Sequence, residues 1–373
     1  MKILINMATL KKGGGQNVAL NFLASISNIE FDDVEFYFFV ADGSDCHQFL
    51  LNAKNDNFRV VPSSPLKRII FELMCAKSVM SRENVDIIYT YFGIGFFRTK
   101  IPQVSGSADS NLYFPEIDFW SHYKGLDRLK KKVVDSYRIW GLKRASAIIF
   151  ENKAMESRSK KLFNLKQTTF IKPSINLDTD IANFNSSVSN KHKGLFLCGW
   201  QLNKNIMIIP EIAFYLKKEG IPFEFVITAP IDNSLEHIRF TEKVKYFDVE
   251  DYINLTGTVK KQDLTSLYEN INFVFLLSKL ESFSNNIIEA WYHKRLLIIS
   301  DEIWSKSICK ESAFYVQRDD AVIIASALGK IIKDKKLQNL IIEKASIELL
   351  SYPTINERTV SEINYLKQIY ECS

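Results

Sequence analysis

Short apolar runs alternate with longer amphipathic segments along most of the chain. In the first half the apolar runs are KILINM, VEFYFFV, FRVVP, DIIYTY, IPQVSG, AIIFE and TTFIKP, and in the second half they are GLFLCG, FEFVITA, YINLTG, FVFLLS and LLIIS. Runs of this length predict buried strands. The amphipathic segments predict helices over 16–27, 66–81, 126–144, 205–218, 261–269 and 319–333. Such alternation predicts an α/β fold of parallel sheets with helices on both faces.

The alternation breaks once, in the polar stretch PSINLDTDIANFNSSVSNKHKG. We interpret this break as a linker over 176–193, between an N-terminal domain over 1–175 and a C-terminal domain over 194–352. A final helix is expected over 353–373, after Pro353. A length of 373 residues suits two domains. Two sheets of similar size predict twin Rossmann-like domains facing a cleft.

Composition is that of an ordinary globular protein, with 46% apolar and 24% charged residues. No apolar run approaches the ~18 residues needed to span a bilayer, and the N-terminus reads as a strand, so we expect a cytoplasmic protein. The five cysteines form no C-x-x-C pair, and the five histidines show no H-x-x-x-H spacing. The sequence therefore predicts neither a disulfide framework nor a metal site.

The net charge of +5 is concentrated in one region. Residues 121–172 contain 14 Lys and Arg against 4 Asp and Glu, which points to an acidic surface rather than to nucleic acid. The helix expected at 126–144 should pack Leu129, Val133 and Trp140 on the core, with its basic residues in solvent. Either an ordinary solvated helix or peripheral contact with the anionic inner membrane fits this pattern.

A glycine-rich loop follows the first predicted strand and leads into a helix. Gly13, Gly14 and Gly15 let the backbone approach a ligand closely, and the helix N-terminus offers amides to a phosphate or sugar. The spacing is neither G-x-G-x-x-G nor a P-loop, which disfavours dehydrogenases and kinases. The alternative is a flexible turn without a ligand.

The stretch KLESFSNNIIEAW places two carboxylates, Glu281 and Glu289, on either side of a predicted helix start. The amides of Ser284, Asn285 and Asn286 would be available to phosphate oxygens, with Ser284 or Asn285 as the N-cap. Glu281 could then accept hydrogen bonds from sugar hydroxyls, and Glu289 could bind a vicinal diol such as a ribose. Otherwise Glu281 interacts with the helix dipole and Glu289 lies on a solvated face.

A lysine precedes the corresponding helix after the first strand of the second domain. In LFLCGWQLNKNIMIIPEIA, Lys204 stands just before the predicted helix start, where its ammonium could lie beside an anion held at that N-terminus. The alternative is a solvated surface lysine.

Taken together, these segments resemble the retaining family-4 glycosyltransferases, which have the two-domain GT-B architecture. The resemblance rests on KKGGGQN, CGWQLNKN, NLTGTVKKQDLTSLYENINFVFLLSKLESF and the E-x7-E pair, with Gly257 and Tyr268 ahead of it. Order and spacing match over nearly the whole second domain and more loosely over the first.

The resemblance implies a role for each matching position. Glu281 would contact the donor sugar, Glu289 the nucleotide ribose, Lys204 and the amides of 284–286 the diphosphate, Val259 the base, and Gly13–Gly15 the donor phosphates and acceptor. Trp200 stands where the family commonly has an arginine, and HKRLLIIS replaces a usual Gly-x-Pro. The family's acceptor-side histidine is missing from QVSGSADSNL, where Asp109 is the nearest ionisable group and so the candidate catalytic residue.

The resemblance further implies a hexosyltransferase that retains anomeric configuration and needs no metal or other cofactor. Its donor would be a nucleotide sugar, and its acceptor a glycan or an undecaprenyl-diphosphate-linked glycan in O-antigen, lipopolysaccharide or capsule synthesis. A nucleotide-sugar 2-epimerase on the same fold is an alternative, although histidines for acid/base work are scarce. A non-catalytic sugar-binding protein is another, although such proteins usually carry a secretion signal.

Overall fold

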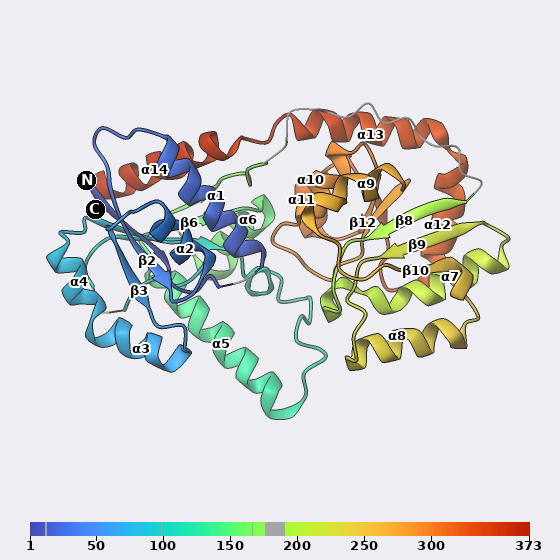
Figure 1. Cartoon of the computed structure of the whole chain (residues 1–373), viewed down its shortest axis with the longest axis horizontal. Coiled ribbons are helices and arrows are strands. Elements are labelled where there is room, and N and C mark those ends of the chain that lie inside the picture. Colours follow the sequence, from blue (N-terminus) through green and yellow to red (C-terminus); the bar gives the residue numbers. More distant parts are fainter. Residues whose placement is uncertain (12, 98, 166, 176–190) are drawn as a thin grey trace. The chain divides into compact units, whose positions relative to one another are not determined.

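The computed structural model describes residues 1–11, 13–97, 99–165, 167–175 and 191–373. The chain forms two compact units (Figure 1). The first comprises Met1–Asn176 together with Pro353–Ser373, and the second comprises Leu177–Tyr352. The chain therefore returns to its first unit at the C-terminal end, an arrangement that the sequence pattern did not indicate.

The first unit is built on a parallel sheet with strand order β3-β2-β1-β4-β5-β6-β7. The strands are β1 (Lys2–Met7), β2 (Glu35–Ala41), β3 (Phe58–Val61), β4 (Ile87–Thr90), β5 (Gln103–Ser107), β6 (Ala147–Phe150) and β7 (Thr168–Phe170). Its helices are α1 (Gly14–Asn28), α2 (Asp45–Asn52), α3 (Pro65–Met74), α4 (Ala76–Arg82), α5 (Gly125–Arg144), α6 (Lys153–Phe163) and α14 (Ile355–Glu371). The strand order reverses between β1 and β4, which is the arrangement of a doubly wound sheet.

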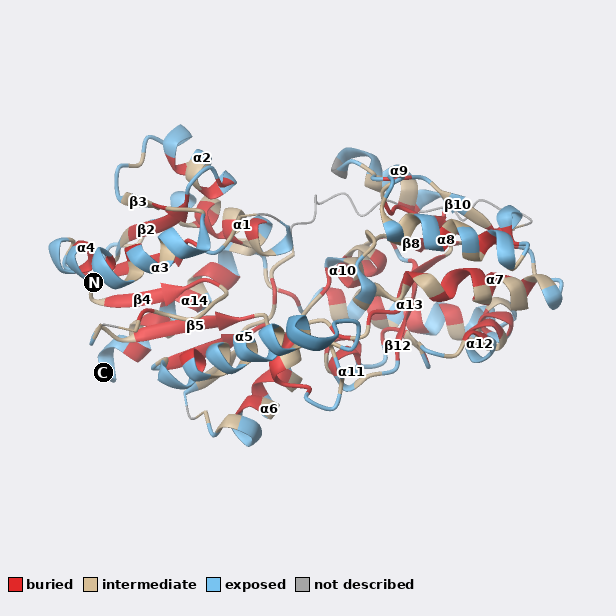
Figure 2. Ribbon diagram, turned by 90° about the horizontal axis from the view of Figure 1, so that it is seen from below, coloured by how far each residue is buried: buried red, intermediate tan, exposed pale blue. Residues whose placement is uncertain are grey.

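Helices cover both faces of this sheet, because side chains alternate between the faces along each strand. In β1, Ile3 and Ile5 belong to the same core as Phe22 of α1. Leu4 belongs instead to the core on the other face, with Phe71 of α3. Figure 2 shows the strands buried between their covering helices. Such continuous apolar strands are typical of parallel sheets that are buried on both sides.

The second unit repeats the plan with the order β10-β9-β8-β11-β12-β13, all parallel. Its strands are β8 (His192–Phe196), β9 (Phe223–Ile227), β10 (Ile253–Leu255), β11 (Phe273–Leu276), β12 (Leu296–Ser300) and β13 (Phe314–Val316). Its helices are α7 (Ile209–Lys218), α8 (Leu235–Tyr246), α9 (Leu264–Glu269), α10 (Asn285–Tyr292), α11 (Ile303–Cys309), α12 (Ala321–Lys333) and α13 (Lys335–Leu349). Here the order reverses between β8 and β11, so the loops after these two strands lie side by side.

All twelve predicted strands are present, whereas the short strand β13 was missed. The helix predicted over 66–81 is divided at Cys75 into α3 and α4, and the one predicted over 205–218 begins at Ile209 after single 3-10 turns. Helices α2, α6, α8, α11 and α13 were not predicted. Residues 176–190 of the predicted linker lie outside the described residues, and β8 already begins at His192.

The predicted packing of the basic helix is wrong. Leu129, Val133 and Trp140 of α5 are exposed rather than docked on the core, and Leu142 is the large apolar residue that the helix buries. The cause is that the apolar stripe of α5 and the face that meets the sheet are different sides of the helix.

Helix α14 is fastened to the first unit by a buried ion cluster. Arg358 donates from Nη2 to Glu151 Oε1 and from Nε to Glu362 Oε1, each at 2.8 Å, and all three residues are buried. Ile363 and Leu366 enter the core next to α1, and Ser25 Oγ lies 2.8 Å from Asn356 Oδ1. Figure 1 shows α14 beside α1.

Replacing Arg358 by Met should destabilise the first unit by about 3–5 kcal/mol, because Glu151 and Glu362 would remain buried without their cation. Urea unfolding monitored by circular dichroism measures the change. Lys367→Met is the matched control: it removes another α14 cation, which pairs with the exposed Asp33, and should leave the midpoint nearly unchanged. Equal midpoints for the two variants would contradict the prediction.

Candidate functional site

The turn from β11 into α10 contains most of the candidate residues. Ser284 is the N-cap of α10, with an extended backbone and no side-chain cap hydrogen bond. Asn286 donates from Nδ2 to the carbonyl oxygen of Leu197 at 2.9 Å, which ties the start of α10 to the end of β8. Asn285 is exposed at the same helix start. The N-terminus of α10 is thus held at the point where the strand order of the second sheet reverses.

Lys204 and Glu281 form a direct ion pair across this point. Lys204 closes the 3-10 turn that follows β8, and its Nζ lies 2.5 Å from Glu281 Oε1. The side chains are 21% and 14% exposed, so the pair is largely shielded from water while part of each group stays accessible. The amide of Lys279 donates to the carbonyl oxygen of Asn203 at 2.7 Å and holds the two loops together. The structure brings together two residues for which the sequence suggested separate roles.

Glu289 is oriented by a tyrosine. The Tyr268 hydroxyl donates to Glu289 Oε2 at 2.8 Å, and burial together with this carboxylate raises the pKa of Tyr268 well above its usual value. The Tyr268 ring stacks on His293, with centroids 4.4 Å apart and planes at 7°. Arg295 Nε donates to the Tyr268 carbonyl oxygen at 2.8 Å. Sequence reasoning placed Tyr268 in the pattern but found neither its hydrogen bond nor the supporting residues, since both depend on tertiary contacts.

Trp200 makes packing contacts and carries no charge with which to hold an anion. Its Nε1 donates to the carbonyl oxygen of Pro230 at 2.7 Å, and its ring stacks on His237 with centroids 5.5 Å apart. Lys204 is therefore the cation that the loop after β8 contributes near Glu281. Val259 is partly exposed in the loop after β10, beyond Gly257, whose φ of 75° favours glycine.

The remaining candidates lie in the first unit, at the carboxyl edge of its sheet. Gly13 has a φ of 81° and directly precedes α1, which begins with Gly14 and Gly15. A side chain at Gly13 would meet no atom within 4 Å, so the backbone angle rather than lack of space explains this glycine. This loop follows β1, and β4 is the one strand that lies between β1 and β5 in the sheet.

Asp109 follows β5 and is held by α5. Arg138 Nη1 lies 3.3 Å from Asp109 Oδ1 and 3.5 Å from Asp135 Oδ1. Burial raises the pKa of Asp109, while Arg138 opposes and Asp135 reinforces the rise. Asp135 also accepts hydrogen bonds from Asn111 Nδ2 at 2.9 Å and Trp120 Nε1 at 2.5 Å. Asp109 is thus part of a network that anchors the loop after β5 to α5.

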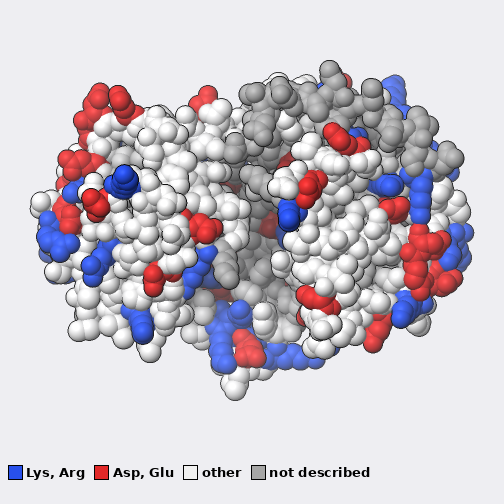
Figure 3. Space-filling model, viewed as in Figure 1, with Lys and Arg blue, Asp and Glu red and all other residues white. Residues whose placement is uncertain are grey.

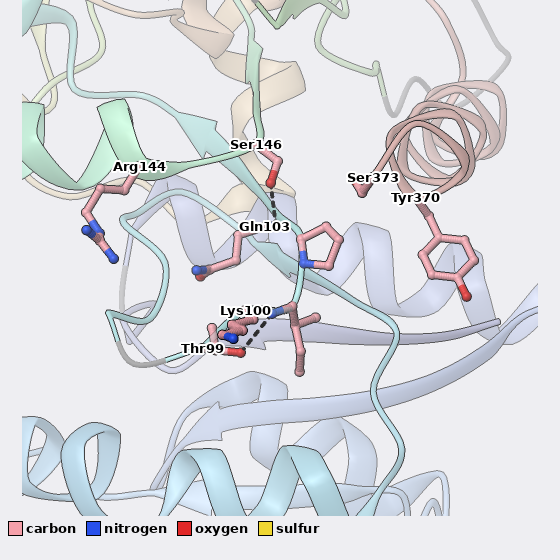
Figure 4. Close-up of a pocket in the computed structure, with 9 residues that line it drawn as sticks. Thr99, Lys100, Gln103, Arg144, Ser146, Tyr370 and Ser373 are labelled. Carbon is pink, nitrogen blue, oxygen red and sulfur yellow. Dashed lines mark hydrogen bonds between the residues drawn. The ribbon is translucent and has the colours of Figure 1, made fainter.

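A pocket of about 440 Å³ lies elsewhere in the first unit (Figure 4). Its lining residues include Lys100, Gln103, Arg144 and Tyr370. The backbone N–H of Gln103 donates to Ser146 Oγ at 3.1 Å. Gln103 is the first residue of β5, so this pocket lies at the opposite edge of the sheet from Asp109. None of the candidate residues lines it.

In the part of the chain that the structure describes, no group of three or more His, Cys, Asp or Glu side chains is placed to hold a metal ion. Within the same ranges, no helix combines the length and the apolar character required to cross a bilayer.

Residues 192–334 match the family described as glycosyl transferases group 1. This range contains the candidate residues of the second unit, including Lys204, Glu281 and Glu289. This match supports a glycosyltransferase. No curated protein is similar enough in sequence to count as a match.

Solved structures resemble the whole chain at low sequence identity. Sucrose-phosphate synthase from Thermosynechococcus elongatus covers 100% of both chains at 13% identity and a TM-score of 0.73. Anabaena HepE in complex with UDP covers 99% of this chain and 100% of its own, at 15% identity and a TM-score of 0.70. A TarM mutant from S. aureus, in complex with UDP, fondaparinux and α-GlcNAc-glycerol, covers 98% of this chain and 99% of its own, at 11% identity and a TM-score of 0.66. The chain has the GT-B fold of two Rossmann-like units, as predicted.

Stability should fall in mildly acidic solution because of His293. Burial, reinforced by Arg295, lowers the pKa of His293 to about 4. The unfolded chain, with a histidine pKa of about 6.5, therefore binds the proton first as the pH falls. The contribution of neutral His293 to the free energy of unfolding is complete above pH 6.5 and is lost as the pH falls towards 4. From pH 7 to pH 5 the expected loss is about 2 kcal/mol.

Urea unfolding at pH 7 and pH 5 measures this loss, with His293→Phe as the comparison. The phenylalanine keeps an aromatic ring against Tyr268 but cannot titrate, so its stability should change less over the same interval. An identical change in the two proteins would contradict the assignment to His293.

Proposed function

We propose that the chain is a retaining hexosyltransferase that moves a sugar from a nucleotide-sugar donor to a glycan or lipid-linked glycan. The observation that carries the proposal is the pairing of Lys204 with Glu281 beside the N-terminus of α10, inside the region that matches a glycosyltransferase family. A cation, a carboxylate and a helix N-terminus at one strand-order reversal suit a sugar diphosphate.

Each group of the second unit then has a distinct task. Lys204 and the amides of 284–286 would hold the diphosphate, because a helix N-terminus and a lysine both favour anions. Glu281, held in place by the same lysine, would contact the donor sugar. Glu289, oriented by Tyr268, would accept hydrogen bonds from the ribose hydroxyls, and Val259 would lie near the base.

The charge changes during transfer suit this arrangement. Departure of the diphosphate places negative charge on its oxygens and positive charge on the sugar ring. The Lys204 ammonium would stabilise the former and the Glu281 carboxylate the latter, and both groups are already positioned before the reaction. Lys204 has three hydrogens to donate, so it can contact Glu281 and a phosphate oxygen at the same time.

The acceptor would involve the first unit. We place Asp109 with the acceptor and the loop Gly13–Gly15 with both the donor phosphates and the acceptor, since these residues lie at the carboxyl edge of that sheet, where α/β proteins bind ligands. The complexes of HepE with UDP and of TarM with UDP and sugars support a nucleotide-sugar donor and a glycan acceptor. A bacterial surface polysaccharide such as O-antigen, lipopolysaccharide or capsule is the proposed product class.

A melt-shift and turnover screen with UDP-, GDP- and dTDP-linked sugars tests the function. We expect one nucleotide class to raise the melting temperature and to support transfer both with and without EDTA. Lys204→Met should raise the dissociation constant of the matching nucleoside diphosphate by more than about tenfold, whereas Lys330→Met, on the exposed face of α12, should not change it. No response to any nucleotide would contradict the proposal, and conversion of the donor to its 2-epimer without transfer would indicate the epimerase instead.

The two glutamates should fail in different ways. Glu281→Ala should remove about 2–4 kcal/mol of transition-state stabilisation and so lower kcat. It should leave the affinity for nucleoside diphosphate nearly unchanged. Glu289→Ala should instead weaken the nucleotide by about 1–3 kcal/mol, as expected for the loss of a hydrogen-bonded carboxylate. Tyr268→Phe should shift affinity in the same direction as Glu289→Ala but by less, because it removes only the hydroxyl that orients the carboxylate.

Steady-state kinetics and calorimetric titration separate these effects, and circular dichroism checks that each variant is folded. Full turnover by a folded Glu281→Ala variant would show that the pair is structural.

A further inference from the structure

Helix α3 presents its apolar side to solvent. Leu66, Ile69, Ile70 and Leu73 follow one another at helical spacing and are between 42% and 69% exposed. Phe71, on the other side of the helix, is its buried residue. A helix on the surface of a globular protein normally turns such a stripe towards the core, so the orientation of α3 requires an explanation.

Helix α5 carries a second stripe of the same kind. Leu126, Leu129, Val133, Tyr137 and Trp140 recur every three or four residues and are between 45% and 74% exposed. At this spacing they share one side of the helix. We call the two stripes together the α3–α5 face.

Helices α3 and α5 lie on either side of the strands β4 and β5 in the view of Figure 2. Arg68 and Glu72 of α3 influence the pKa of Tyr137 of α5, which burial raises, so the two helices lie within electrostatic reach of each other. The ring of Trp140 stacks on Phe97 at 4.6 Å, with the Arg144 guanidinium 5.2 Å from its centroid.

Basic residues border this apolar surface. Lys130 and Lys132 project on either side of the α5 stripe, and Lys143 and Arg144 follow at its end. Figure 3 shows Lys and Arg side chains gathered around α5 at the bottom of the view. The Lys131 ammonium lies 4.9 Å from the ring of Trp120 and 4.8 Å from that of Tyr123. Apolar residues bordered by lysines, with Trp and Tyr among them, form the pattern of a helix that lies in a membrane interface.

We propose that the α3–α5 face docks on an anionic lipid bilayer. The charge selects this partner over a second copy of the chain, because a symmetric dimer through this face would bring the same lysines together. The proposal goes beyond the transfer reaction, since none of the residues assigned to donor binding lies on α3 or α5. Its consequence is that a lipid-linked acceptor would be met at the bilayer surface.

Co-sedimentation with vesicles tests the proposal, using vesicles of phosphatidylglycerol with phosphatidylcholine and vesicles of phosphatidylcholine alone. Two variants address the two components: Ile69→Gln/Ile70→Gln/Leu73→Gln removes the α3 stripe, and Lys130→Glu/Lys132→Glu reverses the flanking charge. Glutamine keeps a good helix propensity. The matched controls, on exposed positions of the second unit, are Leu340→Gln/Ile347→Gln and Lys330→Glu/Lys336→Glu.

The wild-type chain and both controls should bind the anionic vesicles, more weakly as salt rises, and each test variant should bind them at least about tenfold more weakly. Nucleoside-diphosphate melt shifts should stay the same in all five proteins, which separates failure of docking from failure of the donor site. Equal vesicle binding by test and control variants would overturn the proposal. So would self-association that the α3 variant abolishes while no protein binds vesicles.

Discussion

The buried contact of Arg358 with Glu151 and Glu362 is the constraint on which the chain's organisation depends. It fixes α14 in the first unit although the whole second unit precedes this helix in sequence. Just before α14, the backbone of Ile175 pairs with Thr354, and its amide donates to the Pro353 carbonyl oxygen at 3.1 Å. The residues of the first unit that flank the second unit in the sequence therefore pair with each other, and the second unit is an insertion between them. Three buried charged residues are costly to desolvate, so this anchoring holds only while all of them remain paired.

Within the second unit, the reversal of strand order between β8 and β11 creates the candidate site. It sets the loop that carries Lys204 against the loop that carries Glu281, and the two side chains meet at 2.5 Å. Glu289 is eight positions further on and already within α10, where Tyr268 fixes it. Glu281 thus pairs with a lysine, and Glu289 accepts a hydrogen bond from a tyrosine hydroxyl. Their different places, one before the helix and one within it, are the physical basis for expecting different kinetic roles.

The sequence predicted the parts of the fold that depend on local pattern and missed those that depend on tertiary contact. Continuous apolar runs identified twelve strands, but β13 has only three residues and left no such run. Helices α6, α8 and α13 are rich in charged residues, which blurs their apolar period. Periodicity showed that α5 is amphipathic, yet it could not tell which side meets the sheet, so Leu129 and Val133 were wrongly placed in the core. In the site, the motif predicted that α10 is capped by Ser284 or Asn285, and Ser284 is the N-cap, whereas the Lys204–Glu281 pair joins residues 77 positions apart and left no local signal.

Helices α3 and α5 each attach to the core through few buried residues, and their apolar stripes are exposed to solvent. Phe71 and Leu142 attach these helices to the core, so the exposed leucines and isoleucines contribute little to the stability of the first unit. Large apolar side chains in solvent carry a risk of aggregation. The lysines beside the α5 stripe reduce that risk by mutual repulsion, and the same charges attract an anionic surface. In the proposed docking, the residues that oppose aggregation are therefore the same residues that attract the bilayer, and reversing Lys130 and Lys132 should weaken the docking while leaving the surface of α5 charged.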